Sequence, residues 1–98
     1  MTKKRGHRRR TAVGEALITN RLGMHARPAT LFVQTANRFK SEIFVSKDGA
    51  EVDGKSIMGI LTFGAGKGTT LKIRAVGEDA EEAIEALSGI VREGFGEE

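Results

Sequence analysis

The pattern of apolar and polar positions changes period several times along the chain, and each period predicts one element. Over residues 26–38, apolar side chains recur every three or four positions, as on the buried face of a helix. The same spacing over residues 79–92 predicts the clearest helix of the chain. A short apolar segment at residues 57–61 predicts a third helix, which Gly59 and Gly64 keep brief because glycine disfavours helix.

Segments that alternate between apolar and polar side chains predict four strands, at residues 11–19, 41–47, 50–53 and 70–76. Asp48-Gly49 is a strong signal for a two-residue hairpin between the middle two. The order is therefore β-α-β-β-α-β-α. Because each strand has one apolar face, we predict an α+β fold with a four-stranded antiparallel sheet and three helices on one face. The end of the chain, residues 94–98, is expected to fray unless Phe95 folds back on the sheet.

Composition limits the chemistry that the chain can perform. Its 98 residues suffice for one modest core but not for a buried catalytic cleft. The absence of cysteine excludes disulfides and thiol chemistry, and two histidines alone argue against a structural zinc site, so no cofactor or metal is expected. No apolar run approaches the roughly 20 residues of a membrane span and none suggests a signal peptide, so we expect a cytoplasmic protein.

The formal net charge of +3 combines two regions of opposite sign. Residues 1–10 hold six lysines and arginines and no acid, whereas residues 11–98 carry 10 basic and 13 acidic side chains. We predict a disordered basic N-terminal extension at residues 1–10, followed by one domain at residues 11–98. A basic arm of this kind can also bind nucleic acid, although we do not expect it here. His7 lies inside the extension and is assigned no role.

The candidate chemistry lies at the start of the first predicted helix. His25 stands just before that helix, followed by Arg27 and by Pro28, the only proline of the chain. A helix N-terminus leaves backbone N–H groups unpaired and carries partial positive charge, so it accommodates an anion. The same field disfavours imidazolium and favours the neutral, nucleophilic imidazole. Arg27 can neutralise an incoming phosphoryl group, and Pro28 costs little in a first helical turn.

Two sequence blocks give this site a family resemblance. Residues 23–29, Gly-Met-His-Ala-Arg-Pro-Ala, resemble the active-site signature of HPr, the histidine-containing phosphocarrier family of the bacterial phosphotransferase system. Residues 54–61, Gly-Lys-Ser-Ile-Met-Gly-Ile-Leu, resemble the regulatory serine segment of that family at the expected separation. The resemblance covers residues 15–90, and it implies that the sheet and helices form an open-faced β-sandwich.

The resemblance implies a phosphoryl carrier rather than a free-standing enzyme. His25 would accept a phosphoryl group at Nδ1 from phosphorylated enzyme I, charged by phosphoenolpyruvate, and pass it to a histidine of an EIIA-type acceptor. Arg27 matches the arginine that stabilises the transferring charge. Ser56 matches the serine that HPr kinase/phosphorylase modifies, which makes that kinase a further implied partner, although a plain helix N-cap is the alternative role. We expect the carrier to be a monomer.

An apolar docking patch is predicted beside this site, because partner binding favours adaptable exposed apolar groups. Its candidate residues, for which a place in the core is the alternative, are Met24, Ile57, Met58 and Leu61.

The branch of the phosphotransferase system stays open at this point. Phe63 and the ending at residues 94–98 look more like the nitrogen-branch carrier, whereas the block around Ser56 looks more like the sugar-branch carrier. Two readings from other classes also stay open. One is a regulatory interaction domain that acts through phosphorylated Ser56, and the other is a nucleic-acid-binding module that uses the basic extension.

Overall fold

The computed structural model describes residues 10–97 and contains a single mixed α+β architecture. The elements in chain order are β1 (Thr11–Leu17), α1 (Ala26–Ala36), β2 (Glu42–Lys47), β3 (Ala50–Asp53), α2 (Ile57–Thr62), β4 (Thr70–Val76), α3 (Ala80–Arg92) and a short 3-10 turn, η2 (Gly94–Gly96). This order confirms the predicted β-α-β-β-α-β-α arrangement. The turn η2 is an addition to it.

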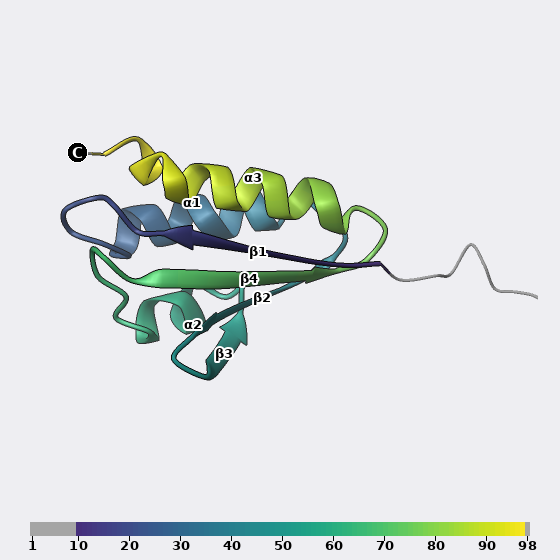
Figure 1. Cartoon of the computed structure of the whole chain (residues 1–98), viewed down its shortest axis with the longest axis horizontal. Helices are drawn as coiled ribbons and strands as arrows, with labels where there is room; N and C mark the ends of the chain where they lie inside the picture. The colour runs from purple at the N-terminus through teal and green to yellow at the C-terminus, as the bar shows by residue number, and fades with distance from the viewer. Residues whose placement is uncertain (1–9, 98) are drawn as a thin grey trace, which may run out of the picture.

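The four strands form one antiparallel sheet in the order β1-β4-β2-β3. The strands β1 and β4, which are far apart in the sequence, lie side by side along their whole length, from the pair Thr11 and Val76 to the pair Leu17 and Thr70. The helix α3 packs on β1 and β4, while α1 packs between α3 and α2 (Figure 1). The result is the open-faced α+β sandwich that the sequence predicts.

The core lies between the sheet and the helices, and the strands supply alternate residues to it. In β4, Leu71, Ile73 and Ala75 are buried while Lys72 is exposed on the other face. Phe32 of α1 and Leu87 of α3 are fully buried against this layer. One buried face and one solvated face are typical of an antiparallel sheet covered on a single side.

The hairpin between β2 and β3 confirms its predicted turn. Asp48 and Gly49 are the two residues between the paired positions Lys47 and Ala50, and both have positive φ angles, 52° and 86°. Two consecutive positive φ angles define the turn that matches the twist of the flanking strands, and Asp-Gly is among the pairs that adopt it readily.

Five element ends differ from the predicted ones: α2 ends one residue later, α3 begins one residue later, and three further ends have a clear cause in their hydrogen bonds. β1 ends at Leu17 because Ile18 exchanges its backbone bonds with Gly68 and Thr69 instead of with a strand. α1 ends at Ala36, since the N–H groups of Arg38 and Phe39 bond three residues back instead of four and tighten the turn that follows. β2 begins at Glu42, because Ser41 is bonded to Asp79 at the start of α3.

The expected fraying at residues 94–97 is wrong, and the alternative with Phe95 folded back is the better description. Phe95 is only 8% exposed and belongs to the core cluster, and its backbone adopts a φ of 57° in η2. Burial of this aromatic side chain offsets the cost of ordering the segment. In consequence the last described residue, Glu97, is placed at the predicted site.

At the other end of the chain, the predicted extension at residues 1–10 falls almost wholly outside the described residues. Arg10 is described, and its carbonyl accepts a hydrogen bond from the N–H of Gly77 at 2.8 Å. This residue therefore belongs with the domain.

Candidate functional site

The loop that carries His25 is fixed by close contact with the loop before β4. Gly23 has a φ of +69°, and a Cβ atom at this position would lie 2.6 Å from the carbonyl oxygen of Ala65. The next residue, Met24, donates its N–H to that same oxygen at 2.9 Å. Only glycine satisfies both the backbone conformation and the contact, so Gly23 sets the approach of the chain to α1.

His25 begins α1 through its backbone, so its imidazole is not used to cap the helix. The residue is extended (φ −99°, ψ −168°), its carbonyl accepts the N–H of Ala29 at 3.0 Å, and its side chain makes no capping bond. In the first turn, the N–H groups of Ala26 and Arg27 have no partner within the helix, and Pro28 has none to donate. An anion beside His25 would meet these groups at the positive end of the helix dipole.

The imidazole is bonded to Glu97, which sequence reasoning missed. His25 Nε2 lies 3.1 Å from Glu97 Oε1, and the buried Asn20 donates from Nδ2 to the same oxygen at 3.1 Å. The hydrogen bond with His25 holds the pKa of Glu97 below its ordinary value, although desolvation raises it. The bond from Asn20 and the charges of His25 and Arg27 lower this pKa further. Glu97 is therefore ionised at neutral pH.

This contact sets the protonation pattern of the ring. An ionised carboxylate only accepts hydrogen bonds, so a bond with His25 requires a proton on Nε2. In the neutral imidazole the lone pair is then on Nδ1. The geometry thus makes Nδ1 the nucleophilic atom, the same nitrogen that the family resemblance implies.

Arg27 is exposed on the first turn of α1 and is available to a ligand. Within residues 10–97 its guanidinium forms no hydrogen bond or ion pair. Its charge acts on Glu97 without a direct contact. A guanidinium with unused donors next to a nucleophilic nitrogen fits the binding of a phosphoryl group.

The site is open to partner molecules. The side chain of His25 is 36% exposed and that of Glu97 is 17% exposed. A shallow hollow of about 580 Å³ adjoins them, between the outer face of α1 and the pair Phe95 and Glu97. A group in such a position can be reached by the active site of another protein, and it cannot exclude water as an enclosed catalytic cleft does.

The structure separates the predicted docking residues into two groups. Ile57 and Met58 are exposed at the start of α2, at 40% and 71%, and Leu61 is partly buried. Met24 is only 5% exposed and belongs to the core, which corrects its expected place in an exposed patch. The bond between its N–H and Ala65 fixes the backbone where the side chain points inward.

Ser56 occupies the N-cap of α2, as the sequence suggests. Its Oγ accepts the N–H of Gly59 at 3.0 Å, and the backbone of Ser56 is extended. The side chain is half-buried. The helix α2 packs against α1, so Ser56 and His25 begin two neighbouring helices.

Residues 10–97 contain neither a candidate metal cluster nor a helix that could cross a membrane. No cluster of three or more histidine, cysteine, aspartate or glutamate side chains there could hold a metal ion. No helix in this part of the chain is long and apolar enough to span a membrane.

The fold and the site define a small α+β domain that presents one reactive histidine at a helix N-terminus, in the manner of a phosphoryl carrier. A family model described as "PTS HPr component phosphorylation site" matches residues 13–93. The chain therefore belongs to the HPr family of phosphocarrier proteins, whose activity is phosphoryl transfer in the phosphotransferase system.

Individual relatives agree with this assignment. The phosphocarrier protein HPr of Neisseria meningitidis is 46% identical over 80 residues, which are 82% of this chain and 90% of the relative. The HPr-like protein Crh of Bacillus subtilis is 51% identical over 71 residues, 72% of this chain and 84% of the relative. The crystal structure of HPr from Thermoanaerobacter tengcongensis superposes with a TM-score of 0.85 at 49% identity, over 89% of this chain and 98% of that one.

Proposed function

We propose that His25 is the residue that carries the phosphoryl group, on Nδ1. The observation that carries the proposal is the bond between His25 Nε2 and the ionised carboxylate of Glu97. The donor is phosphorylated enzyme I, charged from phosphoenolpyruvate, and the acceptor is a histidine of an EIIA-type protein. We place this reaction in the cytoplasm. We also propose that the protein acts as a monomer; the three residues of the site, His25, Asn20 and Glu97, contact one another within one chain.

The transfer step follows from the protonation of the ring. The Nδ1 lone pair forms a bond to phosphorus as the bond between phosphorus and the donor imidazole breaks. The new phosphorylated ring keeps its proton on Nε2 and gains a positive charge, which the Glu97 carboxylate stabilises at 3.1 Å. Arg27 and the free N–H groups of the first α1 turn hold the phosphoryl oxygens, which carry most of the developing charge. Passage to the acceptor is the reverse of this step.

Ser56 is proposed as a regulatory phosphorylation site. Its hydroxyl already lies at a helix N-terminus, where a phosphate is favoured by the dipole. Phosphorylation adds nearly two negative charges beside the exposed apolar residues Ile57 and Met58. If enzyme I and the acceptor dock on these residues and on Leu61, the added charge weakens that docking.

A second candidate function is regulatory binding through phosphorylated Ser56. Two observations favour it: the geometry of Ser56 at the N-cap of α2 and the similarity to the HPr-like protein Crh. In this alternative the phosphoserine is itself part of the surface that a partner recognises. The choice between the sugar and the nitrogen branch is independent of both candidates and depends on the acceptor.

The deciding experiment is phosphorylation of the purified chain by enzyme I and phosphoenolpyruvate, followed by intact mass and acid treatment. We expect one acid-labile phosphoryl group on the wild type and on Ser56→Ala, and none on His25→Ala. Absence of phosphate from the wild type with an active enzyme I would overturn the carrier proposal. The regulatory candidate would then be tested on Ser56 with HPr kinase/phosphorylase.

A further inference from the structure

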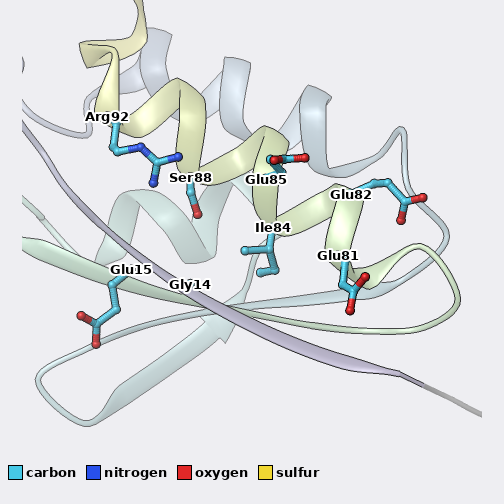
Figure 2. A pocket seen from close by; sticks show the side chains of 8 residues that line it. All are labelled: Gly14, Glu15, Glu81, Glu82, Ile84, Glu85, Ser88 and Arg92. Atoms are coloured by element: carbon cyan, nitrogen blue, oxygen red, sulfur yellow. The ribbon is translucent and has the colours of Figure 1, made fainter.

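A groove between β1 and α3, away from His25, is lined by acidic side chains that the carrier reaction does not use. The groove has a volume of about 610 Å³ (Figure 2). Three glutamates on the first two turns of α3 border it, Glu81, Glu82 and Glu85. Figure 2 shows Glu15 of β1 with its carboxylate directed away from α3, so the charge of the groove comes mainly from the helix.

These helix glutamates have no partners in the part of the chain that the structure describes. All three are exposed, and between residues 10 and 97 their carboxylates form no ion pair and no hydrogen bond. The basic side chain of this groove, Arg92, is at the opposite end of α3. The half of the groove near the start of α3 is therefore a concentrated and unneutralised negative surface.

A second, independent feature of the groove is the unpaired hydroxyl of Ser88. This residue is only 3% exposed, and its Oγ has no hydrogen-bond partner in the structure. Figure 2 shows the hydroxyl directed from α3 toward β1, at the level of Gly14. A Cβ atom on Gly14 would lie 2.9 Å from this Oγ. A buried polar atom without a partner is costly, and a donor that entered the groove would satisfy it.

We propose that the basic segment at residues 1–9 of this same chain binds the groove. Five lysines and arginines lie in this segment, with no acidic residue. The described chain begins next to the groove: Arg10 is bonded to Gly77, three residues before α3, and β1 and α3 start at the same end of the molecule (Figure 1).

Length and tethering favour this segment over a separate ligand. Nine residues span up to about 30 Å when extended, while the 13 residues of α3 are about 20 Å long. The segment can therefore reach Glu81, Glu85 and Ser88 from Arg10. Its covalent link gives it a high effective concentration at the groove, so many weak charge contacts suffice for binding.

The test uses the absence of cysteine from the chain, which permits a single spin label on Thr2→Cys in the full 98-residue protein. We expect the label to broaden the amide signals of Gly14 and of residues 81–88. The broadening should be lost between about 0.01 M and about 1 M salt, as the Debye length falls from about 30 Å to about 3 Å.

The matched variants are Glu81→Gln/Glu85→Gln in the groove and Asp48→Asn/Asp53→Asn on the β2–β3 hairpin. Each pair removes two carboxylate charges and changes size little. We expect the groove pair to lose the broadening and the hairpin pair to keep it, with phosphorylation of His25 unchanged in both.

Three outcomes would overturn the proposal. The first is broadening confined to the residues next to Arg10 and insensitive to salt. The second is equal broadening in the two variant pairs. The third is broadening that appears only when spin-labelled chains are mixed with ¹⁵N chains that carry no spin label. That result would show that the segment binds the groove of a second copy.

Discussion

His25 is hydrogen-bonded to the carboxylate of Glu97, which lies 72 residues later in the sequence. The bond from Nε2 to Glu97 leaves the lone pair of the neutral ring on Nδ1, and Asn20 donates to the same carboxylate oxygen, Oε1. In the proposed transfer, reactivity at this site depends on three side chains, of which only the imidazole takes the phosphoryl group. Asn20 and Glu97 act as positioning residues.

Replacement of Glu97 tests this arrangement. In Glu97→Ala the acceptor is gone, so we expect a smaller fraction of the Nε2–H tautomer in ¹⁵N spectra of the His25 ring and slower phosphorylation. Glu97→Gln keeps a neutral acceptor oxygen, so it should retain the tautomer while losing the charge that stabilises the phosphorylated ring. A wild-type tautomer ratio and rate in Glu97→Ala would contradict the role given to this residue.

The sequence predicts those residues of the site that a local motif or a helix start identifies. His25, Arg27 and Ser56 stand beside helix starts and within short motifs, and the structure confirms that His25 and Ser56 begin helices. Glu97 has no such context, because its place depends on the burial of Phe95 and on a contact across the whole chain. Asn20 lies three residues before the motif at residues 23–29, and nothing local indicates that it is buried.

At the scale of elements, Asp79 joins the start of α3 to the start of β2. Its carboxylate accepts bonds from the N–H groups of Lys40 and Ser41 and from the Ser41 hydroxyl, and its side chain makes no cap on its own helix. The hydroxyl bond of Ser41, with those backbone bonds, lowers the pKa of Asp79 below the ordinary value near 3.8, against the effect of burial.

Stability should therefore depend on the charge of Asp79. A lowered native pKa means that the stabilisation is complete above the ordinary aspartate value and is lost as pH falls through the native pKa. We expect Asp79→Ala to lose about 1.5–3 kcal/mol in the free energy of unfolding, measured by urea at neutral pH, since hydrogen bonds to a charged group are removed. This variant should also lose part of the acid dependence below about pH 4. An unchanged acid dependence would contradict the assignment.

Gly14 sets how closely β1 and α3 approach. A Cβ at this position would lie 2.7 Å from Ile84 Cγ2, whereas a Cβ on Gly89 of α3 meets nothing within 4 Å. We expect Gly14→Ala to destabilise the fold by about 1–3 kcal/mol through overpacking. The matched change Gly89→Ala should stabilise it by up to about 1 kcal/mol through helix propensity. Thermal unfolding of both variants checks the pair, and equal shifts in Tm would refute the packing argument.

The elements were predictable because the spacing of apolar side chains is a local property of the sequence. Several of the element ends were not predictable, because they depend on distant contacts. Asp48-Gly49 specifies its own turn, and the apolar stripe of α3 specifies its own buried face. By contrast, β2 begins one residue late because Ser41 is bonded to Asp79, 38 residues away. The role of Gly14 within the first strand depends likewise on a distant element, because α3 packs against it.

On the scale of the whole molecule, the candidate site and Arg10, the residue that follows the basic segment, are at opposite ends of β1. His25 follows the far end of β1, and Arg10 precedes the near end (Figure 1). The seven residues of β1 alone separate these ends by about 20 Å. If the basic segment binds the β1–α3 groove as proposed, its charge is remote from the carrier chemistry proposed for His25.

Deletion of residues 2–9 tests whether the basic segment contributes to phosphorylation of His25 or to any binding of DNA. It removes five basic side chains and takes the formal net charge from +3 to −2. At about 0.15 M salt the Debye length is about 8 Å, much shorter than the separation, so we expect the rate of His25 phosphorylation by enzyme I to be unchanged. Any affinity of the full chain for DNA should fall by about 0.9 in log K per phosphate contact for each tenfold increase in salt, and it should vanish on deletion.

Either result for the deletion variant, compared with the full chain, assigns a role to residues 2–9. A deletion variant that is phosphorylated normally but no longer binds DNA would assign nucleic-acid binding to the segment and phosphoryl transfer to the domain. A variant that is phosphorylated more slowly at this salt concentration, with the same melting temperature as the full chain, would show that the segment contributes to enzyme I docking. In that event the charge of residues 2–9 would have to act near His25, in conflict with its proposed place at the β1–α3 groove.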